Sequence, residues 1–219
     1  GIMGAGIMGL GFEKLVYGGL TKVFAGIVIA PIGGVIFGLL LTGLIITIFA
    51  NRKPAIVNKT FGRLQIISSA WFALTHGAND GQKTMGIIVL ILFSAGLIPE
   101  LEMPLWVIFA AATAMGLGTF FGGYKVIKTL GVKITKLKPY QGFAAETGGG
   151  IMLAIFATLG IPASTTHAIT GTIMGAGAAR RKRAVRWNVS RQIVFSWIIT
   201  IPGSAAMGIG FTFLINLFV

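Results

Sequence analysis

Long apolar stretches alternate along the chain with short segments that carry most of its charge. The apolar stretches are residues 23–50, 84–98, 105–123 and 192–219. A helix needs about 20 apolar residues to cross roughly 30 Å of hydrocarbon, and these stretches reach or approach that length. Because helices satisfy their own backbone polar groups in lipid, the pattern predicts an all-α, polytopic membrane protein.

Composition supports this interpretation. The chain is 55% hydrophobic and only 11% charged, with a mean hydropathy of +0.89, whereas soluble domains average about 25% charged residues. Its 33 glycines allow helices to approach closely. The net charge of +13 does not indicate nucleic-acid binding, because the basic residues lie between apolar stretches. There they orient a membrane protein and contact membrane lipid.

The basic residues predict which side of the membrane each loop occupies. Excess Lys and Arg on short loops marks the cytoplasmic side. We therefore expect three cytoplasmic loops in a plasma or bacterial inner membrane, at residues 51–63, 124–141 and 180–191. The acidic loop 99–104 is then external, and the last apolar stretch places the C-terminus outside.

One five-residue sequence, Ile-Met-Gly-Ala-Gly, occurs at 2–6 and again at 173–177. The same offset of 171 aligns Pro31 with Pro202 without a gap. The first copy is followed by few charges and the second by many basic ones, which indicates two related segments inserted in opposite orientations. Inverted repeats of this kind are typical of secondary transporters, with the substrate bound where the repeats meet.

The repeat predicts three parts of the chain. Residues 1–50 are the C-terminal remainder of a first inverted repeat, 51–63 a cytoplasmic basic loop, and 64–219 a complete second repeat. A first-repeat partner of residues 77–80 would lie upstream of residue 1. We therefore expect a fragment, or one part of a split transporter, that needs the missing first-repeat segment on the same or a separate chain in order to transport.

A first polar cluster, His-Gly-Ala-Asn-Asp-Gly-Gln-Lys-Thr, occupies residues 76–84 within segment 64–98. That segment is too long for one unbroken span, and glycines flank Asn79 and Asp80, so we predict a broken helix there. A carboxylate inside the membrane costs at least about 2.5 kcal/mol and usually marks an ion pathway. Asp80 is thus predicted to hold a cation, with Lys83 either pairing with it or extending to the interface.

A second polar cluster follows Gly160-Ile161-Pro162, where segment 142–179 is predicted to turn as a helical hairpin, either spanning or re-entrant. Ser164, Thr165 and Thr166, with free amides at a helix start, offer an oxyanion site. Each hydroxyl alone could instead bond to the carbonyl four residues earlier, and His167 could be a packing residue. Glu146 is the other carboxylate within the hairpin and is predicted to be functional.

These clusters carry a family resemblance. HGAND at 76–80, GFAAET at 142–147 and GIPASTTH at 160–167 resemble the second-repeat motifs of the PiT inorganic phosphate transporter family. The resemblance implies a homodimeric symporter that imports inorganic phosphate with Na⁺ or H⁺ by alternating access. It implies phosphate contacts from Gly77, Ala78, Asn79, Ser164, Thr165 and Thr166. It assigns the coupling cation, including any Na⁺, to Asn79, Asp80 and Glu146, with modulating roles for Gln82, Lys83, Thr147 and His167.

One departure and two alternatives qualify this prediction. Many members of the family have asparagine where this chain has Lys83, and a fixed cation there would favour H⁺ coupling. A site of hydroxyls and amides would also accept sulfate or another tetrahedral oxyanion. A hydrolase built on Ser164, His167 and Asp80 is disfavoured because adjacent positions on one turn fit poorly and no Gly-x-Ser-x-Gly motif is present. We therefore predict no enzyme activity and no cofactor.

Overall fold

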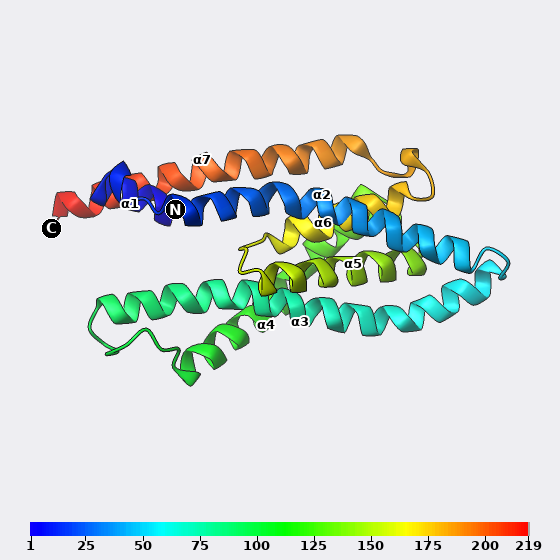
Figure 1. Ribbon diagram of the computed structural model, residues 1–219, viewed down its shortest axis with the longest axis horizontal. Helices are drawn as coiled ribbons and strands as arrows, with labels where there is room; N and C mark the ends of the chain where they lie inside the picture. Colours follow the sequence, from blue (N-terminus) through cyan, green and yellow to red (C-terminus); the bar gives the residue numbers. More distant parts are fainter. Residues whose placement is uncertain (219) are drawn as a thin grey trace. The chain divides into compact units, whose positions relative to one another are not determined.

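The structure, a computed structural model, describes residues 1–218, and every regular element in that range is helical (Figure 1). The α-helices are α1 (Ile2–Leu10), α2 (Tyr17–Ile48), α3 (Pro54–Ser94), α4 (Leu105–Lys128), α5 (Pro139–Thr158), α6 (Thr165–Ala178) and α7 (Trp187–Phe218). Short 3₁₀ turns cover Phe12–Lys14 and Lys182–Ala184, and a π-helix covers Thr129–Ile134. The all-α prediction is confirmed.

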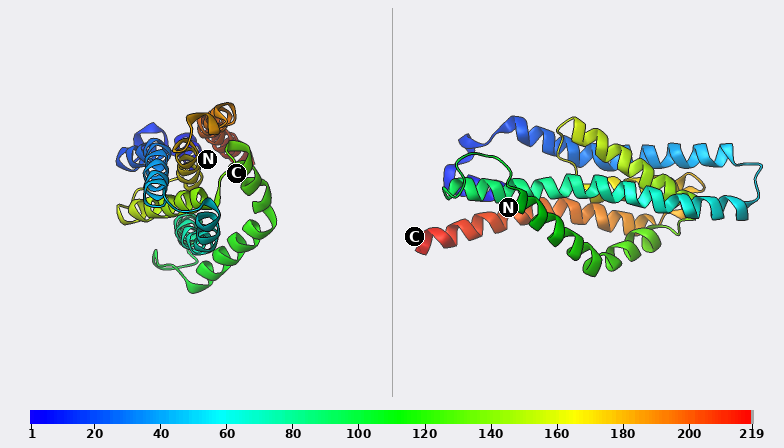
Figure 2. Two further views of the ribbon diagram at one scale, coloured as in Figure 1. Left: turned by 90° about the vertical axis from the view of Figure 1, so that its right-hand side faces the viewer. Right: turned by 90° about the horizontal axis from the view of Figure 1, so that it is seen from below.

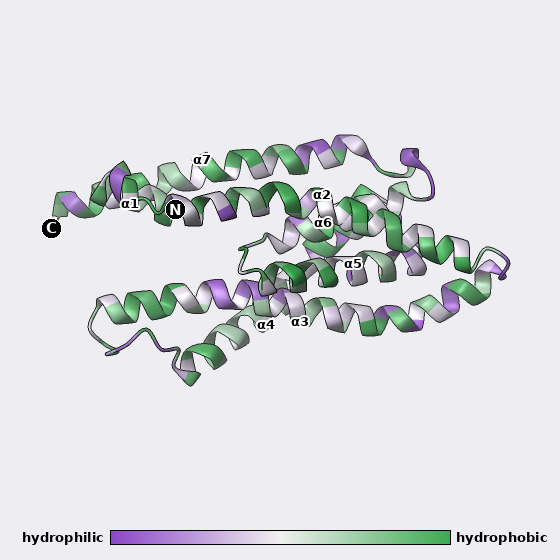
Figure 3. Cartoon of the chain, in the orientation of Figure 1, coloured by the Kyte–Doolittle hydropathy of each residue, from purple (hydrophilic) through white to green (hydrophobic). Residues whose placement is uncertain are grey.

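Three of these helices are long and apolar enough to cross a membrane. They are Tyr17–Ile48, Leu105–Ile134 (α4 with the π-helix) and Trp187–Phe218, and Figure 3 shows their largely hydrophobic colouring. They coincide with three of the predicted spans, 23–50, 105–123 and 192–219. The fourth apolar stretch, 84–98, instead forms the last part of α3. The side of the membrane on which each loop lies remains a prediction.

Helix α3 is continuous, so the break predicted within residues 76–84 is wrong. It runs for 41 residues, about 60 Å at 1.5 Å per residue. Glycine allows a break without forcing one, and neither Gly77 nor Gly81 has a positive φ. The side chains of Asn79 and Asp80 find partners on α5 and α6, as described below. No backbone group therefore has to be released to satisfy them.

The basic segments are shorter as loops than predicted. Helix α3 already begins at Pro54, within the predicted loop 51–63, and proline suits the first position of a helix. Helix α4 and the π-helix extend through most of 124–141, and α7 begins within 180–191. Long basic side chains can reach water from the end of a helix, so their charge does not require a loop. The segment 99–104 is non-helical, as predicted.

The contacts divide the chain into two compact units, Val23–Val185 and Gly1–Lys22 with the segment from Arg186 onward. In the larger unit α5 packs on α3 and α6 packs on α5, while α4 leaves this bundle at an angle (Figure 2). Small residues bring α2 against α6. They recur every four residues on α2, at Gly26, Ala30, Gly34, Gly38 and Thr42, all buried, a spacing that lets helix backbones approach closely.

The smaller unit repeats this packing with the other copy of the repeat. A Cβ atom on Gly4 of α1 would overlap the carbonyl of Ala205 on α7, just as one on Gly175 of α6 would overlap the carbonyl of Val35 on α2. Gly4 and Gly175 correspond at the offset of 171, and α2 and α7 are both 32-residue helices with an internal proline. Each copy's Ile-Met-Gly-Ala-Gly helix therefore packs on the other copy's proline helix. This supports the inverted repeat, whose boundaries at 50 and 64 remain a prediction.

Candidate functional site

The hairpin of α5 and α6 turns where the sequence predicts. Gly160 has φ +60°, a left-handed conformation that glycine adopts without a steric penalty. The amide of Ile161 donates to the carbonyl of Phe156 at 3.0 Å and closes α5. Helix α6 has only 14 residues, about 21 Å, which is shorter than the hydrocarbon core. This length favours a re-entrant hairpin over a spanning one.

The three hydroxyls at the start of α6 do not form one group. Ser164 is the N-cap, and its Oγ accepts a hydrogen bond from the amide of His167 at 3.3 Å. Thr165 is buried, whereas Thr166 is exposed. Successive helical residues point about 100° apart, so the predicted cluster of three adjacent hydroxyls is corrected to one inward hydroxyl, that of Thr165, beside a capping serine.

Asp80 lies at the centre of a polar network that joins α3 to α6. The Thr165 hydroxyl donates to its Oδ2 at 2.8 Å. His76 Nε2 lies 3.0 Å from the same oxygen, and Lys83 Nζ donates to Oδ1 at 2.9 Å. The Asp80 side chain is 32% exposed, so the network is partly accessible. We call these four residues the Asp80 cluster.

Lys83 also fixes the end of the hairpin. Its Nζ donates to the carbonyl of Ala163 at 2.5 Å, and Ala163 is the residue before the cap of α6. One ammonium group thus bridges the Asp80 carboxylate and the backbone that leads into α6. Of the two roles predicted for Lys83, the ion pair is the one that the structure contains.

The remaining residues of the first motif lie around this cluster without joining it. Asn79 is buried, and its side-chain amide donates to the carbonyls of Thr75 at 2.9 Å and Leu153 at 3.4 Å, so it ties α3 to α5. Gly77 is half-buried, whereas Ala78 and Gln82 are exposed. The structure therefore does not bring Ala78 or Gln82 to the Asp80 cluster.

A second polar group surrounds Glu146 on α5. Ser68 Oγ donates to its Oε2 at 2.6 Å, and Gln65 Nε2 donates to its Oε1 at 3.3 Å. Gly142, one helical turn earlier, makes room for this contact, because a Cβ there would overlap the Gln65 side chain. We call Gln65, Ser68 and Glu146 the Glu146 cluster; Thr147, next in the chain, is half-buried.

The two carboxylates occupy separate places. Ser68 and Asp80 are twelve residues apart on α3, which corresponds to about 18 Å along the helix. A single cation site that uses both Asp80 and Glu146 is therefore not what the geometry provides. Among the residues that the structure describes, no group of three or more His, Asp or Glu side chains is placed to hold a metal ion. Any Na⁺ would depend on backbone and hydroxyl oxygens as well.

Gln65 and Ser68 are the site residues that the sequence analysis missed. A signal for them exists in the helical phase of α3. Ser68, Thr75 and Asn79 follow one another at spacings of seven and four, and all three are buried. Gln65 lies on the same face, so α3 presents one polar stripe to the hairpin. The motifs did not predict this stripe, because Gln65 and Ser68 precede the His-Gly-Ala-Asn-Asp sequence.

Comparison with known proteins fits this arrangement of motifs. Residues 1–208 match the model of the Phosphate transporter family. The chain belongs to this family. It is 48% identical over 206 residues to a probable low-affinity inorganic phosphate transporter of Rhizobium meliloti, covering 94% of this chain and 62% of that protein. It is 40% identical to the protein of the same name from Bacillus subtilis, covering 99% of this chain and 65% of that one.

The fold is also known from a solved structure. A solved structure described as "The sodium-dependent phosphate transporter" superposes with a TM-score of 0.83 at 25% sequence identity, covering all of this chain and 72% of that one. The recognition of the family from its motifs is thus confirmed. The chain spans a little under two thirds of the length of the two curated relatives above.

Proposed function

We propose that this chain forms part of a transporter that moves inorganic phosphate across the cell membrane with a coupling cation. The observation that carries the proposal is the Asp80 cluster, within a chain that matches the Phosphate transporter family over residues 1–208. There the start of a helix, a hydroxyl and an ammonium group converge on one carboxylate. The homodimer and the first-repeat segment remain predictions, as do the roles of the individual site residues.

The phosphate is proposed to bind at the start of α6. Free amides and a positive helix end favour anions there, and the Thr165 hydroxyl and Lys83 Nζ lie at the same end. Asp80 alone would repel the anion. Its pairing with Lys83 at 2.9 Å neutralises that charge, so the site can accept a phosphate oxygen without an unpaired carboxylate beside it.

Coupling is proposed to follow from the single proton of the Thr165 hydroxyl. In the structure that proton is donated to Asp80, and a hydroxyl has only one to give. Thr165 can donate to phosphate only if Asp80 releases the bond. A cation or proton that neutralises Asp80 weakens the carboxylate as an acceptor and so makes this exchange favourable. Anion binding and cation binding would thereby support each other.

Lys83 bears on the identity of the coupling ion. Its ammonium group lies 2.9 Å from Asp80 Oδ1. It occupies the position that a Na⁺ bound to this oxygen would need. We propose that Lys83 takes the place of part of a Na⁺ site and that the transporter is coupled to H⁺. Glu146, held by Ser68 and Gln65, is the second group proposed to receive a mobile cation, and its oxygen-rich surroundings also suit Na⁺.

The direct test is uptake of labelled phosphate by proteoliposomes that contain the complete transporter, under an imposed H⁺ or Na⁺ gradient. We expect accumulation that collapses when the driving gradient is dissipated, and that unlabelled sulfate competes poorly. Equal competition by sulfate would favour the alternative of a general tetrahedral-oxyanion permease, since hydroxyls and amides alone do not distinguish the two anions. Uptake that never exceeds equilibration would indicate an uncoupled channel.

Replacing Lys83 by asparagine is expected to make uptake depend on Na⁺. The substitution removes the fixed cation at 2.9 Å from Asp80 and leaves a carboxylate that a mobile cation can neutralise. We expect the Na⁺/choline ratio of uptake rates to rise at least about fivefold, the effect of roughly 1 kcal/mol of differential binding. The measurement is initial uptake at fixed pH in the two salts, and an unchanged ratio in an active variant would count against the role of Lys83.

Replacing Thr165 by valine is expected to raise the KM for phosphate about tenfold while the protein stays folded. Valine keeps the shape but removes the hydroxyl that donates to the Asp80 carboxylate, and a hydrogen bond to a charged group contributes about 1.5 kcal/mol or more. Thr158→Val is the matched control, because that exposed hydroxyl donates only to the carbonyl of Ile155. A similar KM in the two variants would remove Thr165 from the site.

A further inference from the structure

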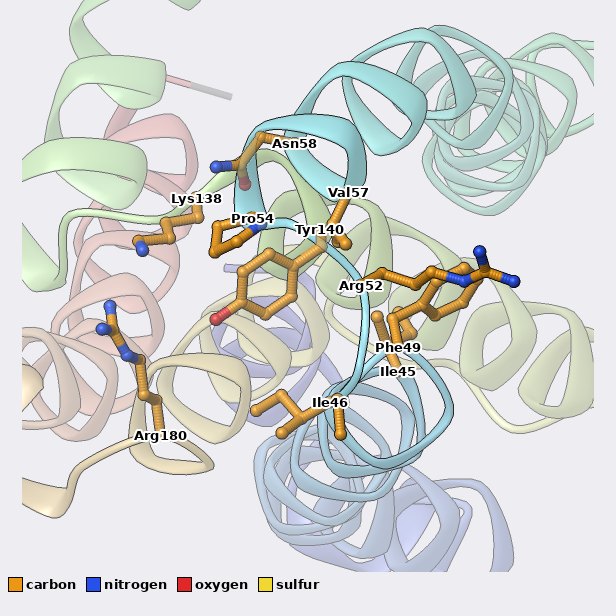
Figure 4. Close-up of a pocket in the computed structure, with 11 residues that line it drawn as sticks. Ile45, Ile46, Phe49, Arg52, Pro54, Val57, Asn58, Lys138, Tyr140 and Arg180 are labelled. Carbon is orange, nitrogen blue, oxygen red and sulfur yellow. The ribbon is translucent and has the colours of Figure 1, made fainter.

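A second candidate binding site lies at the junction of α2 and α3, away from the Asp80 cluster. It is a cavity of about 200 Å³ bounded by the end of α2, the start of α3, the start of α5 and Arg180, which follows α6. Its wall is apolar, formed by side chains such as Ile45, Phe49 and Val57. Its polar lining comes from Arg52, Asn58, Lys138, Tyr140 and Arg180 (Figure 4).

The polar lining gathers on one side of the cavity. In Figure 4 the guanidinium of Arg180 points toward the amino group of Lys138 and the hydroxyl of Tyr140, whereas Arg52 extends away from them on the other side. No carboxylate lines the cavity. Within residues 1–218 neither Lys138 nor Arg180 takes part in an ion pair, since the pairs there involve Asp80. Two cations beside a phenol and free of acidic neighbours are suited to a phosphoryl group.

We propose that this cavity binds the headgroup of an anionic phospholipid with a hydroxylated headgroup, of the phosphatidylglycerol type. The phosphate would be held by Lys138 and Arg180, with the Tyr140 hydroxyl as a further donor. The apolar wall would contact the lipid's glycerol backbone and upper acyl carbons. A free phosphate ion would leave that wall unused, which is why a lipid is the occupant we choose.

Asn58 supplies a reason for the hydroxylated headgroup. Its Oδ1 atom is buried and has no hydrogen-bond partner in the structure, and a buried acceptor without a partner is destabilising. A headgroup hydroxyl donates a hydrogen bond, whereas a choline headgroup has none to donate. With a turn of the Asn58 side chain toward the cavity, the lining offers donors for a phosphate and an acceptor for a neighbouring alcohol.

The position of the cavity along the helices also fits a lipid. The apolar helix α2 ends at Ile48 and the cavity begins at Ile45, so it lies where a membrane-length helix meets its polar flank. Basic pockets between helices at this level are known to attract anionic headgroups. The proposal adds a lipid site to the chain and does not depend on the proposed transport function.

The test is native mass spectrometry of the purified full chain with phosphatidylglycerol and with phosphatidylcholine of identical acyl chains. We expect at least about fivefold stronger retention of phosphatidylglycerol, since one cation near a headgroup contributes roughly 1 kcal/mol. Lys138→Met and Arg180→Met should each reduce that preference about fivefold. Lys59→Met is the matched control, because Lys59 follows Asn58 in α3 but does not line the cavity; its preference should stay within twofold of wild type.

Three outcomes would overturn the proposal. They are an unchanged preference in the Lys138 and Arg180 variants, an equal loss in Lys59→Met, and displacement of the lipid by 10 mM inorganic phosphate, which would assign the cavity to the free ion. Circular dichroism confirms that each variant is helical. Should both charge variants fail to fold, Tyr140→Phe removes only a hydroxyl and is expected to weaken retention about threefold. Wild-type retention in Tyr140→Phe would then count against the site.

Discussion

Replacing Asp80 by asparagine is expected to reduce concentrative phosphate uptake about 100-fold. The Asp80 carboxylate oxygens lie 2.8–3.0 Å from the Thr165 hydroxyl, His76 Nε2 and Lys83 Nζ. The amide of asparagine would offer these groups one acceptor oxygen and no charge. Lys83 is left without its counter-ion, but this pair is partly exposed, so its loss accounts for only about 1 kcal/mol, or less than tenfold. The neutral side chain also cannot exchange a cation or proton. The measurement is gradient-driven accumulation of labelled phosphate in proteoliposomes.

A second variant separates the loss of coupling from the cost of an unpaired lysine. Asp80→Asn combined with Lys83→Met leaves neither charge unpaired, so we expect its thermal stability to return toward that of the wild type while accumulation stays absent. Glu100→Gln, an exposed acidic residue outside the cluster, controls for a general effect of removing negative charge. Wild-type accumulation in Asp80→Asn would contradict the role proposed for this carboxylate.

The local parts of this site could be predicted from the sequence. Gly160 and Pro162 mark the hairpin turn, and Ser164 caps α6, because turns and caps depend on residues that are adjacent in the chain. The Asp80–Lys83 pair follows from a spacing of three on one helix. Even the proximity of the two motifs could be inferred, since both are polar groups within an apolar chain and are stabilised by meeting each other.

The parts of the site that depend on distant partners could not be predicted from the sequence. Whether α3 breaks at its glycines is decided by Leu153 and Thr165, more than 70 residues away, which satisfy Asn79 and Asp80 and so remove the need to unwind. Which serine bonds to Glu146 likewise depends on the helical phase of α3. Ser68 bonds to it, whereas the adjacent Ser69 is exposed and bonds to the carbonyl of Ile66. Composition does not distinguish two neighbouring serines.

Replacing Gly38 by alanine is expected to lower the free energy of unfolding by about 2–3 kcal/mol, in the range typical of overpacking. Gly38 lies in the α2–α6 contact, where an added Cβ would overlap the carbonyl oxygen of Thr172 and lie 2.9 Å from the amide nitrogen of Ala176. Those are backbone atoms, which cannot rotate aside as a side chain can. The helices must separate, which is expected to lower the melting temperature in detergent by about 5–10 °C.

Gly43→Ala is the matched control for this change, because it makes the same substitution five residues further along α2, at a glycine whose Cβ would meet nothing within 4 Å. Alanine favours helix over glycine by about 1 kcal/mol, so Gly43→Ala should be neutral or stabilising. Replacing glycine by alanine on the same helix is then expected to lower the free energy of unfolding at Gly38 and to leave it unchanged or raise it at Gly43. Phosphate uptake should fall in Gly38→Ala as well, because moving α6 moves Thr165 relative to Asp80, and a displacement of about 1 Å is enough to disturb such a site. Equal melting temperatures in the two variants would mean that α2 and α6 are not in contact through Gly38, and the close packing that positions the hairpin would have to be abandoned.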